Sequence, residues 1–393
     1  MSNLIICDVE TILLSYRYGE DELWQWSGGT TLQRNAVLVK ITTNEGIVGI
    51  GEIGESAYLP RSVQLIVEEQ FKGLLIGEDP LDIERLWEKM YVRSSHWGRK
   101  GVVIPIISGL EIALWDIAGK YLDQPVYELL GGCYRDKIRV YASAGMDSSL
   151  SELQAEVRSY VKQGYTAIKI RIGHHDLKAD LEKVRAVKEV TGDDVALMVD
   201  AGQCYVDFAW DYNTALRVAR ELDKLGVYWL EEPFHPDNLD DYARLNQKVD
   251  VAVTGGENEF TKYGFKDLIL NRCVDILQPD VTHTGGILEC KKIAAMAQAF
   301  HMRIAPHIFG AGIGLMANMH FIISTPNAFI MEYDETVNPL RTELLKEPLV
   351  VENGYLLIPS RTPGLGVELH RDTVERFPFI DDEAVEKHEY KPR

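Results

Sequence analysis

Short apolar segments alternate with amphipathic helical segments along the chain from about residue 137 onward. In residues 167–173, AIKIRIG, isoleucines alternate with Ala, Lys and Arg at a period of two, which is typical of a β-strand. Seven further segments are short, apolar and bounded by turn residues, so they are also predicted to be strands. The eight predicted strands cover residues 138–145, 167–173, 196–202, 227–234, 251–258, 274–281, 303–309 and 329–334. Helices are predicted between them over residues 151–163, 178–190, 213–225 and 286–300.

Eight strands linked by crossover helices predict a parallel (β/α) barrel, and we place it at residues 126–344. A doubly wound open sheet is the alternative arrangement of such units. The even spacing of the eight units favours closure into a barrel.

The part of the chain before residue 126 has a different pattern. Residues 1–55 are predicted to form a β-meander, because two strand-like runs flank the turn sequence TNEG at 43–46. Helical spacing is predicted for residues 62–92 and 102–121. These elements predict an α+β domain over residues 1–125. The segment from about 345–393 begins with a hairpin-like pattern, and we expect it to pack back onto this first domain.

Composition excludes several classes of function. The 393 residues carry a formal net charge of −19, with 60 acidic against 41 basic residues. Nucleic-acid and anionic-membrane binding are therefore not expected, because both need a basic surface. The five cysteines are scattered and contain no CxxC pair, which is typical of reduced thiols in a cytoplasmic protein. The sequence shows neither a signal peptide pattern nor an uncharged apolar run of 18 residues, so no membrane span is predicted.

Polar side chains recur at the carboxyl end of the predicted strands, where a (β/α) barrel carries its chemistry. A single acidic residue after a strand is usually a helix cap or a solvated turn residue. That explanation is poor for a set that recurs at matching positions in successive units. The set comprises Lys169, Arg171, Asp200, Glu231 or Glu232, Glu257, Asp280, His307 and Glu332.

Three of these residues predict a metal site. Asp200, Glu231 and Glu257 follow consecutive strands, and neighbouring strands lie about 4.8 Å apart, so their carboxylates should converge. Three clustered anions need a cation. An all-oxygen ligand set without nearby cysteine favours Mg²⁺. In a regular strand, the side chains of Glu231 and Glu232 point in opposite directions. We therefore assign Glu231 as the metal ligand and expect Glu232 to lie behind the ligands.

Two further features of the barrel ends suggest acid–base chemistry. Asp280 and His307 end neighbouring strands, and a carboxylate beside an imidazole fixes its tautomer and makes it a stronger base. Glu332, if it is shielded from solvent, is expected to stay protonated and to donate a hydrogen bond to a developing oxyanion.

In this order, the motifs resemble the mandelate racemase branch of the enolase superfamily over nearly the whole chain. The matching stretches are KIR, VDAG, WLEEP, GGEN, QPDVTHTGGI, APHIF and IMEYD. The resemblance implies an α+β capping domain and a (β/α)7β TIM-type barrel, with Mg²⁺ bound by the three carboxylates. It further implies a base formed by Asp280 and His307, an enediolate stabilised by Glu332 and a substrate carboxylate in contact with Lys169. A muconate-lactonizing branch is disfavoured, because the end of the sixth strand, DVTHTGG, contains no lysine.

The chain differs from the racemase pattern at Arg171, where the racemase has a second catalytic lysine. Arginine stays protonated, so it is a poor base and a good anion clamp. Racemisation needs a base on both faces of the carbon, whereas β-elimination needs only one, His307. We therefore predict dehydration of a sugar acid, an aldonate or aldarate, to a 2-keto-3-deoxy acid. The alternatives are a racemase or epimerase acting through the same enediolate and a non-catalytic binding protein.

The capping loops are predicted to choose this small-molecule carboxylate substrate. Tryptophan stacks well on sugar faces, and hydroxyls need polar partners. The predicted substrate-binding residues are Arg17, Tyr18, Trp24 and Tyr58. A third candidate loop, residues 91–101, contains His96 and Arg99. A homo-oligomer is expected because relatives are commonly symmetric oligomers.

Overall fold

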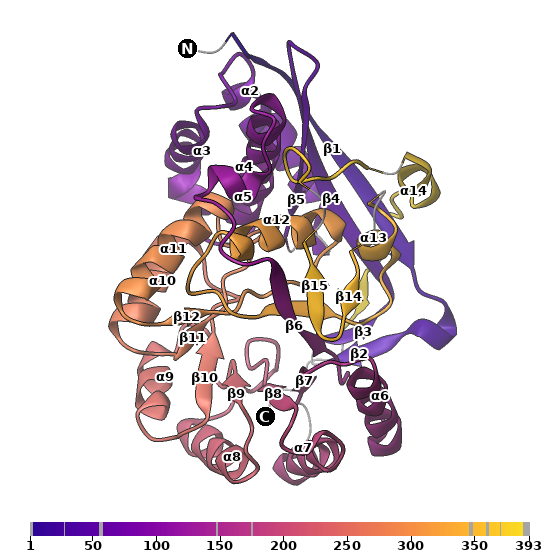
Figure 1. The fold of residues 1–393 in the computed structure, drawn as a ribbon, viewed down its shortest axis with the longest axis vertical. Coiled ribbons are helices and arrows are strands. Elements are labelled where there is room, and N and C mark those ends of the chain that lie inside the picture. Colours follow the sequence, from indigo (N-terminus) through magenta and orange to yellow (C-terminus); the bar gives the residue numbers. More distant parts are fainter. Residues whose placement is uncertain are drawn as a thin grey trace.

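The structure is a computed structural model, and it describes residues 3–26, 28–54, 58–146, 148–173, 176–345, 349–358, 361–369 and 371–387. An N-terminal antiparallel sheet with its helices lies at one end of the molecule, and a barrel of strands surrounded by helices lies at the other (Figure 1). The two parts meet over the mouth of the barrel.

The N-terminal sheet has three long strands in the order β1-β4-β5. They are β1 (Ile6–Arg17), β4 (Gln33–Thr43) and β5 (Val48–Ile53), and both pairs are antiparallel. The predicted hairpin at residues 43–46 is confirmed, since it connects β4 to β5. Two glycines of β5 let a helix lie directly on this sheet. A Cβ at Gly51 would stand 1.9 Å from the carbonyl oxygen of Gly109 in α4 (Val103–Tyr121), and a Cβ at Gly49 would meet Ala113 as closely.

The predicted helical stretch over residues 62–92 is interrupted in the structure. Its elements are α1 (Pro60–Ile66), the π-helical turn η3 (Val67–Phe71), α2 (Lys72–Leu75) and α3 (Ile83–Gly98). The break follows Leu75, where Gly77 adopts a positive φ of 85° and Pro80 removes a backbone donor.

All eight predicted barrel strands are present. They are β6 (Lys137–Ser143), β7 (Ala167–Arg171), β8 (Ala196–Asp200), β9 (Trp229–Glu231), β10 (Ala252–Gly255), β11 (Ile276–Leu277), β12 (Arg303–Ile304) and β13 (Met331–Asp334). Each of the first six pairs in parallel with the next, and β13 pairs in parallel with β6. An isolated parallel bridge from Ile304 to Ala328 joins the last gap, so the barrel is closed and the open-sheet alternative is wrong.

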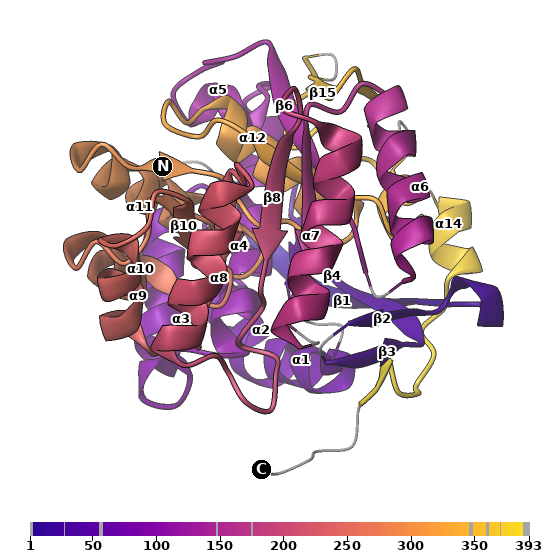
Figure 2. The same cartoon turned by 90° about the horizontal axis from the view of Figure 1, so that it is seen from below.

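Helices surround the barrel on its outside (Figure 2). They are α6 (Leu150–Lys162), α7 (Leu177–Thr191), α8 (Tyr212–Lys224), α9 (Leu239–Asn246), α10 (Thr261–Leu270), α11 (Ile287–Ala299) and α12 (Gly312–Ile323). A layer of buried apolar side chains fills the barrel interior below the mouth. It consists of Tyr141, Ala167, Met198, Trp229, Ile276, Ala305 and Ile330.

A small second sheet lies over the barrel mouth and was not predicted as strands. It contains β2 (Trp24–Trp26), β3 (Gly29–Thr31) and the C-terminal β16 (Val385–Glu386). Because β16 pairs with β3, residues from the two ends of the chain build one wall of the mouth.

The C-terminal segment contacts both parts of the molecule. The predicted hairpin, β14 (Val351–Glu352) and β15 (Tyr355–Leu357), adds to barrel strand β6, so the expectation that it packs on the first domain is wrong for the hairpin itself. Later residues do reach the first domain through a bridge between Pro378 and Leu14. Short helices α5 (Val126–Leu129), α13 (Pro339–Thr342) and α14 (Arg371–Arg376) complete the fold. The boundary at residue 125 stays a prediction, as does the range 345–393, part of which lies outside the described residues.

All five cysteines are free thiols. Within the described ranges, every helix is too short or too polar to cross a membrane.

Candidate active site

Strand register brings the predicted carboxylates together. Arg171 of β7 is the register partner of Asp200 in β8, and Asp200 is the partner of Glu231 in β9. Glu257 follows the end of β10, the next strand around the barrel. One carboxylate oxygen from each of Asp200, Glu231 and Glu257 lies within 4.8 Å of the others.

This cluster has the chemistry of a site for a hard divalent cation. All three carboxylates are buried, and their donors are oxygens only. Burial raises the pKa of Glu231 to about 8, and repulsion from Asp200 and Glu257 adds to the effect, although Lys169 lowers the pKa. A bound cation relieves this repulsion, so the residues present fit Mg²⁺.

Glu232 occupies a different position from Glu231, as the sequence predicted. Its backbone turns into the left-handed region with φ of 43°, and its Oε2 accepts a hydrogen bond of 2.8 Å from Asn258 Nδ2. Asn258 also lies 3.5 Å from Glu257 Oε1. Glu232 therefore sits behind the three ligand candidates and is held next to them.

Lys169 lies beneath the carboxylates, fully buried. Its Nζ is 2.8 Å from Glu231 Oε1, 2.9 Å from Glu332 Oε1 and 3.7 Å from Asp200 Oδ2. Lys169 is not among the described residues that line the cavity above. The protein's own carboxylates surround the ammonium group, and the contact of Lys169 with a substrate carboxylate stays a prediction.

Arg171 stands at the cavity wall and is held there by a short ion pair. Its Nη1 is 2.5 Å from Asp200 Oδ2, and its guanidinium carbon is 5.6 Å from the centre of the Phe309 ring. Among the described residues, no acceptor bonds its buried Nε. Burial lowers the pKa of Arg171, but Asp200 and the neighbouring carboxylates outweigh burial and hold it above its usual value. Arg171 is thus a permanent cation and the opposite of a proton acceptor.

His307 and Asp280 form the predicted pair. His307 Nδ1 lies 3.0 Å from Asp280 Oδ2, and His307 Nε2 lies 3.8 Å from Glu257 Oε2. Asp280 Oδ1 accepts hydrogen bonds from the backbone N–H and the hydroxyl of Thr282, both at 2.8 Å, and from Asn318 Nδ2 at 3.2 Å. These bonds fix the carboxylate, which in turn orients the ring and leaves Nε2 facing the carboxylate cluster.

The protein groups around His307 make its electrostatic environment strongly anionic. Burial lowers the pKa of His307, but the carboxylates of Glu257 and Asp280 outweigh burial and raise it well above its usual value. The charge of Glu257, the largest of these raising influences, is one that a cation at the cluster compensates.

The expectation that Glu332 stays protonated is wrong. The residue is fully shielded, as predicted, but shielding is not the deciding factor. Burial raises the pKa of Glu332, whereas Lys169 and His307 outweigh burial and lower it to about 2. Its Oε2 also accepts a hydrogen bond of 3.0 Å from the backbone N–H of Ile308, next to His307. Glu332 is therefore an ionised acceptor that ties Lys169 to the His307 loop.

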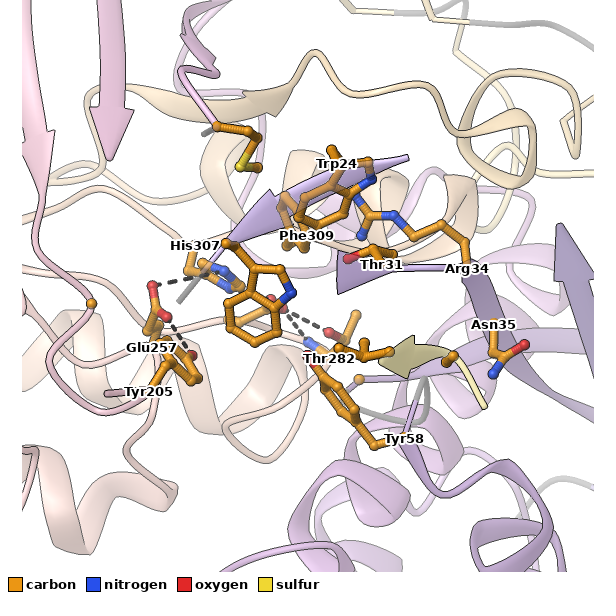
Figure 3. Close-up of a pocket in the computed structure, with 18 of the residues that line it drawn as sticks. Trp24, Thr31, Arg34, Asn35, Tyr58, Tyr205, Glu257, Thr282, His307 and Phe309 are labelled. Carbon is orange, nitrogen blue, oxygen red and sulfur yellow. Dashed lines mark hydrogen bonds and ion pairs between the residues drawn. The ribbon is translucent and has the colours of Figure 1, made fainter. Parts of the chain in front are cut away.

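A cavity opens above these residues, between the barrel mouth and the small β2-β3-β16 sheet (Figure 3). Asp200, Glu257, Asp280, His307 and Arg171 line its barrel side. Two further barrel-loop residues, Tyr205 and Phe309, also line it, and the capping side is formed mainly by Trp24, Trp26, Thr31, Gln33, Arg34, Asn35, Glu52 and Tyr58. In Figure 3, the ring of Trp24 lies beside Phe309, and the two ring centres are 6.1 Å apart. The carboxylates and His307 thus face an aromatic wall.

Only two of the four predicted substrate-binding residues line this cavity, namely Trp24 and Tyr58. Arg17 points to the C-terminal segment, where its Nη1 is 3.2 Å from Asp382 Oδ2. Tyr18 is buried and donates a hydrogen bond of 2.5 Å to the carbonyl oxygen of Val337. The assignments of Arg17 and Tyr18 are therefore wrong. His96 and Arg99, at the exposed end of α3, are also not among the described lining residues.

Sequence reasoning missed Arg34, Glu52 and Tyr205 at the cavity. Arg34 is buried, with its guanidinium carbon 4.1 Å from the centre of the Phe309 ring, and its Nη2 lies 3.0 Å from Asp334 Oδ2. Tyr205 donates a hydrogen bond of 2.7 Å to Glu257 Oε1. For Glu52 a signal did exist, since it is the one charged residue in an otherwise apolar strand, whereas Arg34 stands among other polar residues at the start of β4. Tyr205 lies in an irregular loop, and no pattern marks it.

Comparison with known proteins finds matches to two family models. The family described as "Mandelate racemase / muconate lactonizing enzyme, N-terminal domain" matches residues 18–131. The family described as "Enolase C-terminal domain-like" matches residues 152–373. The two matches correspond to the N-terminal sheet with its helices and to the barrel.

Individual relatives align over almost their whole length. The arabinonate dehydratase of Saccharolobus solfataricus is 38% identical over 379 residues, which are 95% of this chain and 99% of that protein. The D-galactarolactone cycloisomerase of Agrobacterium fabrum is 35% identical over 389 residues, 96% and 99% of the two chains. The crystal structure of a racemase from Streptomyces coelicolor A3(2) with bound magnesium has a TM-score of 0.85 at 29% identity and covers 95% of this chain and 99% of that one.

Proposed function

Because the chain belongs to the mandelate racemase and muconate lactonizing enzyme family of the enolase superfamily, we propose that it is a Mg²⁺-dependent dehydratase of sugar acids. The substrate is an aldonate or aldarate, and the product is a 2-keto-3-deoxy acid. The relatives named for arabinonate dehydration and galactarolactone cycloisomerisation support an acid-sugar substrate.

One observation carries the choice of dehydration. Among the lining residues that the structure describes, one group is suited to act as a base, His307 with its partner Asp280, and a guanidinium stands at Arg171. The 2.5 Å ion pair between Arg171 and Asp200 commits that guanidinium to its charged form. A single base suffices for elimination, since the same imidazole can take one proton and return it.

The proposed reaction breaks two bonds of the substrate. His307 Nε2 accepts the proton from the carbon α to the carboxylate, and the electron pair of that C–H bond moves into the carboxylate to give an enediolate. The enediolate then expels the β-hydroxyl, which leaves as water with the proton that His307 returns. The resulting enol becomes the 2-keto-3-deoxy acid by tautomerisation. Asp280 keeps Nδ1 protonated and so keeps Nε2 available as the acceptor.

Asp200, Glu231 and Glu257 would hold the metal ion. When bound, Mg²⁺ supplies the positive charge that stabilises a carboxylate-derived enediolate. The same charge compensates Glu257, which favours the neutral imidazole that a base requires. Lys169 and Glu332 act from below: Lys169 fixes Glu231, and Glu332 fixes the backbone of the loop that carries His307.

The aromatic wall supports a carbohydrate-derived substrate. Trp24, Trp26 and Phe309 offer apolar faces for the C–H side of a sugar chain. The indole N–H groups of Trp24 and Trp26 and the hydroxyl of Thr31 have no bonding partner in the described part of the chain, and they are suited to hydroxyl or carboxylate oxygens.

A racemase or epimerase is the alternative, because it would proceed through the same enediolate. It needs a second base opposite His307, and Arg171 is a poor candidate for the reason given above. A binding protein without activity is disfavoured by the metal-ligand cluster and the oriented histidine together.

A substrate screen tests the proposal. The purified protein with MgCl₂ is incubated with a panel of aldonates and aldarates, and 2-keto-3-deoxy acid formation is measured. We expect turnover of at least one member, abolished by a chelator and restored by Mg²⁺. Absence of Mg²⁺-dependent turnover over the whole panel would contradict the proposal.

A homo-oligomer and a cytoplasmic location also stay predictions. Exposed Leu65 and Trp97 line one shallow hollow on the helices of the capping domain, which supports an association surface there. Size-exclusion chromatography with light scattering would give the number of subunits.

A further inference from the structure

A carboxylate of the capping domain caps a helix of the barrel. Glu52, in strand β5, is 3% exposed, and its Oε1 accepts a hydrogen bond of 2.6 Å from the backbone N–H of Ala311. Its Oε2 accepts a hydrogen bond of 2.7 Å from the backbone N–H of Gly314. Both N–H groups belong to the first turn of α12, whose N-cap residue, Ala311, has no polar side chain of its own. Figure 1 shows β5 and α12 next to each other.

The capped helix holds the partner of the base. Asn318, in α12, donates from Nδ2 to the carbonyl oxygen of Gly314 at 3.1 Å and to Asp280 Oδ1 at 3.2 Å. The other oxygen of Asp280 lies 3.0 Å from His307 Nδ1. A continuous series of hydrogen bonds therefore runs from Glu52 through Gly314, Asn318 and Asp280 to His307.

The same strand also reaches Asp280 by a second route. The backbone N–H of Gly54 donates a hydrogen bond of 3.0 Å to the carbonyl oxygen of Thr282. Thr282 in turn donates twice to Asp280 Oδ1. The approach is close, since a Cβ at Gly54 would stand 2.6 Å from Thr282 Oγ1. The end of β5 thus contacts both of the elements that fix the Asp280 carboxylate.

We propose that Glu52 is a positioning residue that aligns the Asp280–His307 pair with the docked capping domain. Both oxygens of Glu52 are occupied by α12, so it acts through the helix. A base held by these contacts is oriented only when the capping domain closes the cavity over it. This inference uses the proposed dehydration for its kinetic measurement and does not need it for its spectroscopic one.

Glu111 provides a matched control. It lies in α4 of the same domain, is fully buried and caps the neighbouring helix α11, accepting hydrogen bonds of 2.8 Å from the backbone N–H groups of Ile287 and Leu288. No contact in the described structure joins Glu111 to Asn318, Asp280 or His307. Glu111→Gln therefore removes a cap of the same kind without disturbing the hydrogen-bond series.

The experiment compares Glu52→Gln, Glu111→Gln and Asn318→Ala in the full chain with Mg²⁺. In Glu52→Gln, the amide NH₂ faces one backbone N–H, so one cap bond is lost. We expect kcat to fall about 10- to 100-fold with KM changed less than about threefold, as is typical when a residue that orients a catalytic group is removed. Proton NMR should show the downfield Nδ1–H signal of the Asp280–His307 hydrogen bond shifted or lost. Glu111→Gln should keep both kcat and this signal.

Two outcomes would overturn the proposal. One is that Glu52→Gln and Glu111→Gln lower thermal stability alike and leave kcat and the His307 signal unchanged, which makes Glu52 a structural cap only. The other outcome is measured in Asn318→Ala, which also serves if the Glu52 variant fails to fold. This variant keeps the helix cap and removes only the side-chain amide. An unchanged His307 signal in Asn318→Ala would disprove the hydrogen-bond series. If the wild type turns over no acid sugar, the proposed function fails, and the NMR comparison still decides the role of Glu52.

Discussion

The barrel mouth and the capping face line the same cavity. They differ in how well the position of a residue in the sequence predicts its position in the structure. At the barrel mouth, Arg171, Asp200 and Glu231 are register partners across three parallel strands, so their order in the chain is their order in space. On the capping face, Arg17 and Tyr18 lie close in sequence to Trp24, yet only Trp24 reaches the cavity. The sequence therefore predicts the location of functional residues where parallel strands end on one rim of the barrel. It does not predict their location where loops meet.

The two misassigned residues show why. Arg17 pairs with Asp382, and Tyr18 bonds to the backbone of Val337, more than 300 residues further along the chain. Both contacts depend on how the C-terminal part returns to the first domain, which no local pattern encodes. The chemistry of the site therefore belongs to the barrel, and specificity is expected to belong to the capping face.

The largest effect is expected for His307→Asn. Loss of the base should lower kcat by about 10²- to 10⁴-fold, because no other lining residue in the described part of the chain is placed to take the α-proton. Steady-state kinetics on the best substrate of the screen measures this. His301→Asn, at an exposed surface position, is the control and should retain activity. Retained turnover in His307→Asn would remove the barrel mouth from its catalytic role.

The next effect concerns the metal. Glu257→Gln removes one anionic ligand and should weaken Mg²⁺ binding by at least about tenfold. Isothermal titration calorimetry of the metal alone gives the affinity without a substrate. Glu259→Gln, two residues away and paired with Lys100, should bind Mg²⁺ like the wild type. Equal affinity in Glu257→Gln would show that the cluster is not the metal site.

A smaller effect is expected on the capping face. Trp24→Ala should raise KM about 5- to 20-fold and change kcat little, since an aromatic stacking surface is lost and the base is untouched. Arg17→Ala should leave both constants within about twofold, because Arg17 faces Asp382. A large change of KM in Arg17→Ala together with no change in Trp24→Ala would contradict the placement of Trp24 at the cavity and of Arg17 away from it.

The smallest effect concerns stability and pH. Burial raises the pKa of Glu111 to about 7, from the value of 4.5 that applies in the unfolded chain, while the capping N–H groups lower it. A raised folded-state pKa gives stability that is complete below about pH 4.5 and is lost as the pH rises through 7. The Tm of the wild type minus that of Glu111→Gln should therefore fall over this range, by a few degrees. A difference that is constant with pH would show that Glu111 does not titrate there.

Much of the fold followed from the sequence, because hydrophobic period and even spacing fix strands, helices and barrel closure. The helix break after Leu75 and the pairing of β15 with β6 did not follow, since both depend on turns and long-range contacts. At the site, the convergence of the carboxylates could be predicted from the residue types and from their positions at the ends of the strands. The charge of Glu332 could not be predicted, because it is decided by Lys169 at 2.9 Å, and that distance exists only in the folded barrel.

The central claim is that one base acts beside a permanent cation. The most direct test is to incubate the best substrate of the screen with enzyme and Mg²⁺ in D₂O and to follow the α-carbon by NMR. We predict loss of water and formation of the 2-keto-3-deoxy acid, without accumulation of deuterated substrate of inverted configuration. Deuterium exchange with inversion and no loss of water would contradict the account and would indicate a second base opposite His307.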